Sequence, residues 1–357
     1  MGHYRLRPMN GQDGPALEQL DRATPDSGRI GFATEHHFDY VATQRALRPN
    51  FVGLVAEADG HAGLVGSAMM SFGQCQVEGQ ARPYAYLGGL GVHPDFRRRG
   101  IGSSLARRRV ELARQRFGDQ GIIFAGIQGG NEGSVQVAMT WANQRLDDVT
   151  AVALANALDR PPAGGAGLQV RQARPGEMEA VSAKQNDFYR GFNLYSAKSG
   201  RELSEWLAQR PFGQAVNGYY VAVAAAGTKR EEIVAGVGVT REGLLQTMRL
   251  VRMPLPLRLL NLALRLVPRD GLVRRLNCHW FWFADGRPEA GTYLWQSLRW
   301  QERETASTQF LFYDGRSAIS QAIPQRRFLP SEGGTVAVHA PVTLTAERPL
   351  YFNNMPV

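Results

Sequence analysis

The stretch HPDFRRRGIGSS, residues 93–104, places three arginines and two glycines directly before a helical pattern over residues 103–116. The first N–H groups of a helix have no partner within the helix, and they carry a partial positive charge. Gly100 and Gly102 have no side chains, so a ligand can approach the backbone closely there. The stretch therefore predicts a cradle for a phosphate group between a strand and a helix. A glycine turn that only caps a surface helix is the alternative interpretation.

The residues on either side of this stretch follow an α/β order. RPYAYLGGLGV (82–92) is β-rich at its start and glycine-rich at its end, which predicts a bulged strand. The helix is followed by the apolar strand GIIFAGIQ (121–128) and by the short helical segment GSVQVAMTWANQ (133–144). The loop lacks the Gly-Lys-Ser/Thr ending of a P-loop, and no G-x-G-x-x-G occurs in it. Neither of these two nucleotide-binding fingerprints applies.

The segment LGVHPDFRRRGIGSSL resembles the acetyl-coenzyme A loop of the GNAT superfamily of N-acetyltransferases. Arg97, Gly100 and Gly102 match the Arg/Gln-x-x-Gly-x-Gly/Ala pattern, and Val92 and Pro94 match the strand exit before it. The family's second marker, an Asn followed three residues later by Ser or Ala, is matched by residues 131 and 134. The resemblance implies acyl transfer from acetyl-CoA to an amine, without an acyl-enzyme.

The resemblance also implies which residues hold acetyl-CoA. In the family, a backbone N–H of the bulged strand polarises the thioester carbonyl, and the loop and the Asn marker hold the rest of the coenzyme. The cofactor-binding residues expected here are Leu90, Gly91, Val92, Arg97, Arg98, Arg99, Gly100, Ile101, Gly102, Ser103, Asn131 and Ser134.

The residues of acid–base catalysis depart from the family pattern. Many GNAT enzymes place a Glu on the bulged strand, where this chain has Tyr84 and Tyr86. The family's usual acid, a Tyr seven residues after the Asn, is replaced by Ala138. A further candidate is Glu35 in TEHHFDY, in the region that lines the acceptor site of GNAT folds; a polar surface helix is the other interpretation of that cluster. The candidate catalytic residues are therefore Glu35, Tyr84 and Tyr86, and no metal site is expected.

The chain predicts two related α/β domains. DRPPAGGAG (159–167) is typical of a linker. YRLRPMNGQD (4–13) and LQVRQARPGE (168–177) open the two halves alike, each with a strand, a polar turn and a helical pattern. We expect a GNAT domain at 1–158, a linker at 159–167, and a degenerate GNAT-like domain at 168–357 that lacks the loop. Each domain is expected to have a mixed, mostly antiparallel sheet flanked by helices.

Composition and charge bear on the cellular location and on the kinds of partner to expect. The two cysteines of the 357-residue chain make no disulfide framework, which favours a cytoplasmic protein. The formal charge of +9 is spread along the chain without a nucleic-acid-binding signature, so no nucleic-acid partner is expected. The insertion MPLPLRLLNLALRLVP (253–268) is amphipathic; a lid or interface helix is favoured over a membrane contact.

We expect an acetyl-CoA-dependent N-acetyltransferase of the bacterial tandem type that acts on a primary amine of a small molecule. A protein or peptide N-acetyltransferase and a non-catalytic CoA-binding sensor are the alternatives. The apolar C-terminal stretch RPLYFNNMPV (348–357) is expected to dock on the protein, as a cover for a sheet edge or groove or as a carrier of the terminal carboxylate to the site. The sequence carries no signal for the oligomeric state.

Overall fold

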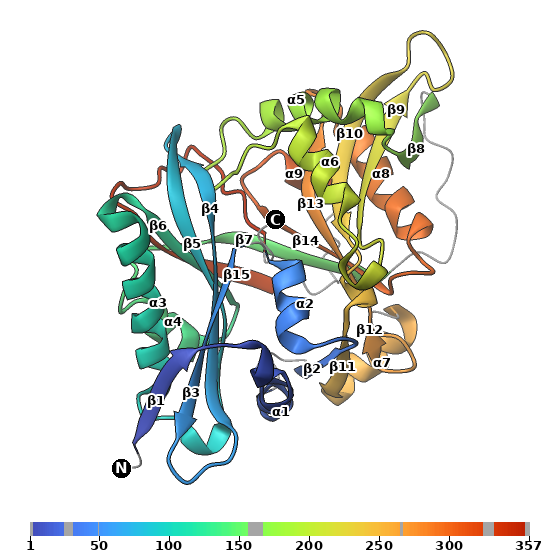
Figure 1. Cartoon of the computed structure of the whole chain (residues 1–357). Coiled ribbons are helices and arrows are strands. Elements are labelled where there is room, and N and C mark those ends of the chain that lie inside the picture. The colour runs from blue at the N-terminus through green and yellow to red at the C-terminus, as the bar shows by residue number, and fades with distance from the viewer. Residues whose placement is uncertain are drawn as a thin grey trace.

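The computed structural model describes residues 3–24, 31–48, 50–155, 167–264, 267–323 and 332–353, and its elements follow a similar order in both halves (Figure 1). The first half contains β1 (Tyr4–Pro8), α1 (Gly14–Ala23), β2 (Gly31–His36), α2 (Tyr40–Leu47), β3 (Phe51–Ala58), β4 (Leu64–Val77), β5 (Gln80–Val92), α3 (Ile101–Phe117), β6 (Ile122–Gln128), α4 (Glu132–Ala138) and β7 (Gln144–Ala155). The second half contains β8 (Gln169–Gln172), α5 (Met178–Phe188), α6 (Gly200–Ala208), β9 (Asn217–Ala224), β10 (Glu232–Thr240), β11 (Gln246–Arg252), α7 (Leu255–Leu264), β12 (Leu272–Val273), β13 (Arg275–Phe283), α8 (Pro288–Gln301), β14 (Thr308–Asp314), α9 (Ile319–Ala322) and β15 (Glu332–His339).

One sheet of twelve strands runs through both halves, in the order β1-β3-β4-β5-β6-β15-β7-β14-β13-β10-β9-β8. Only the pairs β5–β6 and β13–β14 are parallel, which confirms the expected mixed, mostly antiparallel α/β fold. In each half these are the two strands on either side of the long helix α3 or α8, because parallel neighbours need a crossover connection such as a helix.

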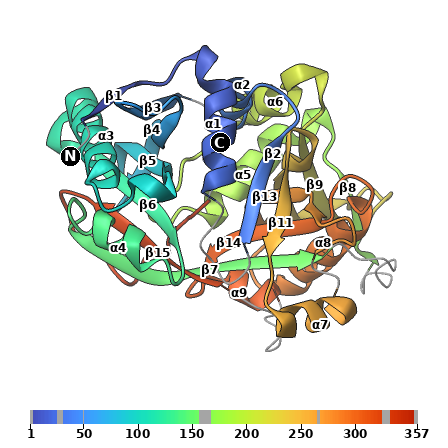
Figure 2. The same ribbon diagram turned by 90° about the horizontal axis from the view of Figure 1, so that it is seen from below.

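The two halves exchange their last strands at the centre of this sheet. β15, the last strand of the described chain, lies between β6 and β7 of the first half, and β7 in turn pairs with β14 of the second half (Figure 2). All three of these pairings are antiparallel. The sheet of each half is therefore completed by a strand of the other half, and residues 159–166 of the expected linker lie outside the described residues.

The openings of the two halves carry the same ion-pair motif. Arg7 holds Asp13 through both guanidinium Nη atoms at 2.8 and 2.7 Å, and Arg171 holds Glu177 in the same way at 2.8 and 2.7 Å. In both halves the arginine stands six residues before its carboxylate, in the first strand, and the carboxylate caps the short turn that follows. The repeat expected from YRLRPMNGQD and LQVRQARPGE is thus present in the side-chain contacts.

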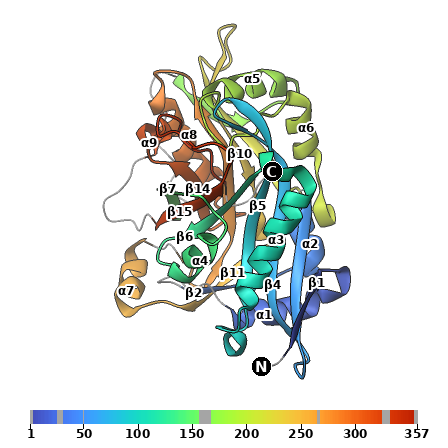
Figure 3. The same ribbon diagram turned by 90° about the vertical axis from the view of Figure 1, so that its left-hand side faces the viewer.

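Helices cover the first half of the sheet on both faces. α3 and α4 lie on one face and α1 and α2 on the other (Figures 1 and 3). α3 begins at Ile101, two residues earlier than expected, because Gly100 takes the left-handed conformation (φ +82°) and caps it. Ile101, Leu105 and Val110 of this helix are buried. Arg109 is also buried, with only 4% of the residue exposed, although arginine side chains usually face solvent.

A second, three-stranded sheet, β12-β11-β2, joins the halves again, because β2 of the first half pairs with β11 of the second. α7, the expected amphipathic insertion, follows β11 (Figure 2). Its Leu255, Leu259 and Leu262 are 73%, 68% and 77% exposed, so these side chains face away from the protein rather than into an interface. In the part of the chain that the structure describes, no helix is long and apolar enough to cross a membrane.

The C-terminal segment docks between the halves, as its apolar composition predicts. Leu350 and Phe352 are buried, and the backbone N–H of Tyr351 donates to the carbonyl oxygen of Asn193 at 2.8 Å. Phe352 packs on β6, where a Cβ added to Gly126 would lie 2.1 Å from its ring. The terminal carboxylate, with Met355 and Val357, lies outside the described residues.

Candidate active site at the divergence of β5 and β6

A cavity of about 460 Å³ opens where β5 and β6 part. The two strands pair only over Tyr84–Tyr86 and Ile122–Phe124, and they diverge after that point. Leu87–Leu90 line one side of the opening, and Ala125–Gln128 line the other. Because each strand has lost its neighbour there, its backbone groups face the cavity instead of a ladder partner.

A bulge in β5 turns the backbone towards this cavity. The ladder between β4 and β5 shifts register between Ser67 and Met69, so that Gly89 and Leu90 are skipped. Gly89 has φ +55°, a conformation that a residue with a side chain rarely adopts. Leu90 lines the cavity, whereas Gly91 and Val92 return to the ladder opposite Ser67 and Gly66.

The predicted cradle lies between the end of β5 and the start of α3. Gly100 caps α3, whose first helical bond runs from the N–H of Ser104 to the carbonyl oxygen of Gly100 at 2.9 Å. The N–H groups of residues 101–103 therefore precede the helical ladder and are available to an anion. Arg97, Arg98 and Arg99 are exposed around the loop. Arg97 and Arg99 donate to the backbone carbonyls of Val92 and Asp95, and Arg99 also lies over the Phe96 ring.

The Asn marker, Asn131, follows β6, which is the strand on the other side of the opening from β5. Asn131 caps α4, and its Oδ1 accepts from the N–H of Ser134 at 3.1 Å. Both residues line the cavity beside Ala138 and Trp141. Of the cofactor-binding residues expected from the sequence, Leu90, Asn131 and Ser134 line this cavity, whereas Gly91, Val92 and the loop residues 97–103 do not.

Comparison with known proteins agrees with this geometry. Residues 17–139 match the model of the acetyltransferase (GNAT) family. This chain therefore carries a GNAT domain. No curated protein matches the sequence.

Solved structures share the whole tandem fold at low sequence identity. A tandem GNAT protein from the clavulanic acid biosynthesis pathway is 16% identical, with a TM-score of 0.57 over 96% of this chain and 100% of that one. N-myristoyltransferase of Saccharomyces cerevisiae, solved with bound myristoyl-CoA, is 10% identical, with a TM-score of 0.61 over 94% of this chain and 82% of that one. A GCN5-related N-acetyltransferase from Sphaerobacter thermophilus is 12% identical, with a TM-score of 0.54 over 99% of this chain and 98% of that one. These likenesses establish the tandem fold.

The far side of the cavity is mainly apolar and is lined by residues of both halves. It reaches across the centre of the exchanged sheet, where Gly334, Ala151 and Ala153 leave room over β15 and β7. Aromatic and branched apolar side chains enclose the rest: Phe32, Val149, Met248, Val267, Val273, Phe310, Phe312, Val336 and Phe352. The described lining contains no carboxylate and no histidine, and its two cations are Arg109 and Arg275.

The second half repeats the bulge of the GNAT domain but not its opening. β13 pairs with β14 only over Arg275–Asn277, and its ladder with β10 shifts register at the position equivalent to the β5 bulge. Counted from the first parallel pair, His279, Trp280 and Trp282 stand where β5 has Gly88, Gly89 and Gly91, and all three are buried. β13 also runs into α8 through residues 284–287, Ala-Asp-Gly-Arg, which lack the Arg-x-x-Gly-x-Gly pattern.

The candidate catalytic residues are not brought together. The Tyr86 ring lies beside Gly88, where an added Cβ would be 3.3 Å from it, and burial raises the pKa of Tyr86 to about 12. Tyr84 points away from the opening, against Gly73, and lines a small separate pocket with Trp280. Burial also raises the pKa of Tyr84.

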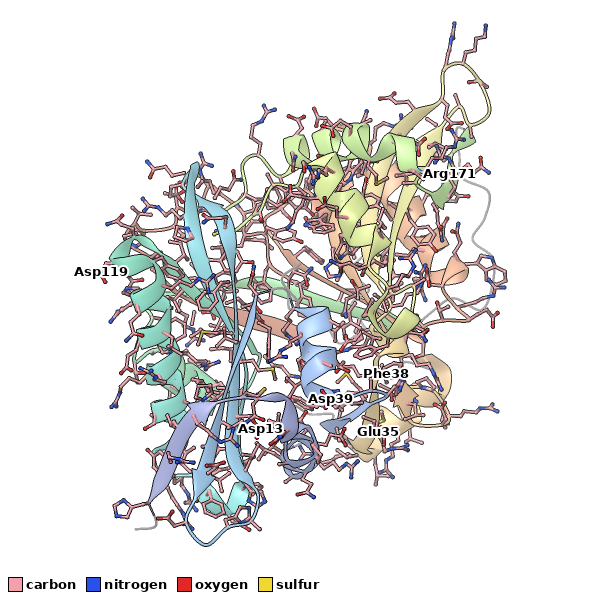
Figure 4. The ribbon with its side chains drawn as sticks, viewed as in Figure 1. Asp13, Glu35, Phe38, Asp39, Asp119 and Arg171 are labelled. Carbon is pink, nitrogen blue, oxygen red and sulfur yellow. The ribbon has the colours of Figure 1, made fainter. Side chains whose placement is uncertain are left out.

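Glu35 lies outside the cavity lining. It stands in β2 (Figure 4), where it pairs with Arg249 of β11. Phe32 of the same strand lines the cavity. The TEHHFDY cluster is not a surface helix: it ends β2, and Asp39 then caps α2 by accepting from the N–H of Ala42 at 2.8 Å. In the described part of the chain, no group of three His, Cys, Asp or Glu side chains is placed to hold a metal ion.

Arg109 is the lining residue that sequence reasoning missed. Its guanidinium Nη1 donates to the carbonyl oxygens of Met69 at 3.0 Å and Gly88 at 2.9 Å, directly beneath the bulge. The signal was present in the spacing, because position 109 follows Ile101 and Leu105 at intervals of four on the buried face. Its residue type, which is usually exposed, outweighed that spacing.

Proposed function

We propose that this chain transfers an acetyl group from acetyl-CoA to a primary amine of a small molecule. One observation carries the proposal: the bulge of β5 opens into the cavity that the Asn131 helix shares, next to the glycine-arginine loop. The loop and its arginines would hold the pyrophosphate, the diverging strands the pantetheine arm, and the backbone N–H at Leu90 the thioester carbonyl. A backbone donor aimed at a developing oxyanion contributes about 3 kcal/mol in comparable sites.

The acceptor amine has to reach the thioester uncharged. The described lining offers no carboxylate or histidine to take its proton, and the pKa of Tyr86, raised to about 12 by burial, keeps that phenol protonated. The proton therefore leaves to water. A polycation is also a poor acceptor, because it would be repelled by Arg109, a lining cation without a carboxylate partner among the described residues.

The test is release of the CoA thiol from acetyl-CoA in the presence of a panel of small amines. We expect amine-dependent release by the full chain and its loss in Gly100→Val, while Gly102→Ala is the matched control on the same turn. Gly100 needs its positive φ, whereas a Cβ at Gly102 would meet only Val92, at 3.6 Å. Binding of acetyl-CoA without turnover by any amine or peptide would instead favour a CoA-binding sensor.

Transfer of a longer acyl group is a second candidate, and the apolar far side of the cavity favours it. Small side chains over β15 and β7 leave a groove that an acetyl group does not fill. The Saccharomyces N-myristoyltransferase, which shares the fold, was solved with myristoyl-CoA. The test measures kcat/KM for a series of acyl-CoA donors from acetyl to myristoyl. Each donor is tested with the same small amine and with a peptide N-terminus, so that donors and acceptors can both be ranked. A kcat/KM that rises with the length of the acyl chain would show that a longer acyl-CoA, rather than acetyl-CoA, is the natural donor.

A further inference from the structure

Arg109 is a buried cation without a carboxylate partner among the described residues. Its Nη1 donates to the backbone carbonyls of Met69 and Gly88, and its Nε has no hydrogen-bond partner in the part of the chain that the structure describes. Burial lowers its pKa to about 10, so it remains charged at neutral pH. A charge taken out of water at this cost is normally paired, and an unpaired one calls for an explanation.

The position of Arg109 supplies that explanation. It projects from α3 into the cavity beneath the bulge, on the face of the sheet that α4 also covers, and Ala138 lines the same cavity from α4. Ala138 stands where the family resemblance places a tyrosine acid, and its methyl group cannot donate a proton or a hydrogen bond. The departing sulfur therefore needs another source of stabilisation on this face.

We infer that Arg109 stabilises the CoA thiolate as it leaves, in place of the missing tyrosine. The inference rests on the proposed function. In the step, the amine nitrogen bonds to the carbonyl carbon, and the carbon–sulfur bond breaks with its electron pair going to sulfur. The nitrogen gives its proton to water, and Arg109 keeps its own. A fixed cation in a water-poor site favours the thiolate without a proton transfer.

The arginine also fixes the bulge, because its contact with the Gly88 carbonyl holds the residue before Gly89. A test must therefore separate the effect of the positive charge of Arg109 from the effect of its hydrogen bond to the Gly88 carbonyl. Arg109→Lys keeps the charge and loses the planar fork, whereas Arg109→Gln keeps donors and loses the charge. Arg108→Gln is the matched control, since Arg108 is exposed on the same helix and pairs with Glu111 at 3.1 Å.

The readout is the ionisation of the thiol of bound CoA, followed by the ultraviolet absorption of the thiolate, with desulfo-CoA as the sulfur-free probe. We expect the wild type to bind CoA about tenfold more tightly with the thiol ionised than protonated, and desulfo-CoA affinity to stay flat with pH. Arg109→Gln should lose the thiolate preference and about 100-fold in kcat, with a nearly unchanged KM for acetyl-CoA. Arg109→Lys should keep part of the thiolate preference and part of the wild-type kcat.

Tyr86 is the titratable side chain that interacts electrostatically with Arg109. The same titration of bound CoA is therefore made with Tyr86→Phe, to show that the pH response does not come from ionisation of the Tyr86 phenol. An unshifted thiol in the wild type, or equal losses in the Lys and Gln variants, would overturn the inference. If Arg109→Gln does not fold, Arg109→Lys decides, because the thiolate preference must survive in it. Failure of the wild type to bind CoA at all would instead count against the proposed function.

Discussion

Trp280 of β13 stands at the position that Gly89 holds in β5, and the two residues share the same unusual backbone, with φ +50° and +55°. The bulge has thus been kept in both halves while its surroundings differ. In the first half glycines leave the bulge open to a cavity, and in the second an indole fills that space. The backbone strain of a non-glycine residue at positive φ is about 1 kcal/mol or more, which burial of the large ring offsets.

His279, the counterpart of Gly88, should make stability depend on pH. Burial lowers its pKa to about 3, against the opposing charge of Glu242, so it is neutral in the folded state. The unfolded chain takes up a proton near pH 6.5, so stability falls as the pH drops below that value. The loss is about 3 kcal/mol by roughly pH 4.

The measurement is chemical denaturation at several pH values for the wild type and for His279→Gln. Gln can still bond Thr240, the 2.9 Å partner of His279 Nε2, but does not titrate. The variant should show a shallower loss of stability in acid, because the contribution of His279 is then absent. Parallel curves for the two proteins would mean that His279 is not held neutral.

Gly126 should tolerate a side chain only when Phe352 is removed. A Cβ at Gly126 would lie 2.1 Å from the Phe352 ring, so Gly126→Ala should destabilise the chain by about 2 kcal/mol. In a Phe352→Ala background the same change should be nearly neutral. Thermal or denaturant unfolding of the four proteins measures the coupling. Additive effects would show that the C-terminal segment does not pack on β6.

A fragment of residues 1–160 should bind acetyl-CoA poorly although it holds every expected cofactor residue. It lacks β15, which lies between β6 and β7, so both strands would present unpaired edges to solvent. Binding calorimetry on the fragment and on the full chain makes the comparison. Full-chain affinity in the fragment would mean that the strand exchange does not support the cavity.

The rate at low acceptor concentration should rise with pH through the pKa of the acceptor amine itself. The cause is the absence of a carboxylate or histidine from the described lining, so that only the neutral fraction of the amine reacts. Two acceptors of similar shape and different pKa provide the test. A common apparent pKa for both would indicate a base on the protein, and Glu35→Gln would then be the first variant to examine.

The sequence carried the local features of the site and missed those that depend on pairing between distant strands. Gly100, Arg97 and Asn131 were predictable because a loop, a helix start and a cap are set by neighbouring residues. The placement of Glu35 was not, since β2 pairs with β11 more than 200 residues later in the chain. The exchange of β7 and β15 likewise has no local signal.

The buried role of Arg109 shows a different limit. Helical spacing placed it on the inner face, but the usual exposure of arginine pointed the other way. Similarly, HWFWF in β13 reads as an ordinary buried strand, and only the register of β13 with β14 reveals that its residues fill a bulge. Burial of a charged or bulky side chain at a special backbone position is decided by the tertiary fold.

Calorimetric titration of the full chain with acetyl-CoA tests the central claim most directly, that one half binds the coenzyme and the other is closed to it. We predict one site per chain in the wild type and none in Gly100→Val, with Gly102→Ala binding as the wild type does. Two equivalent sites, or one site that survives in Gly100→Val, would contradict the account.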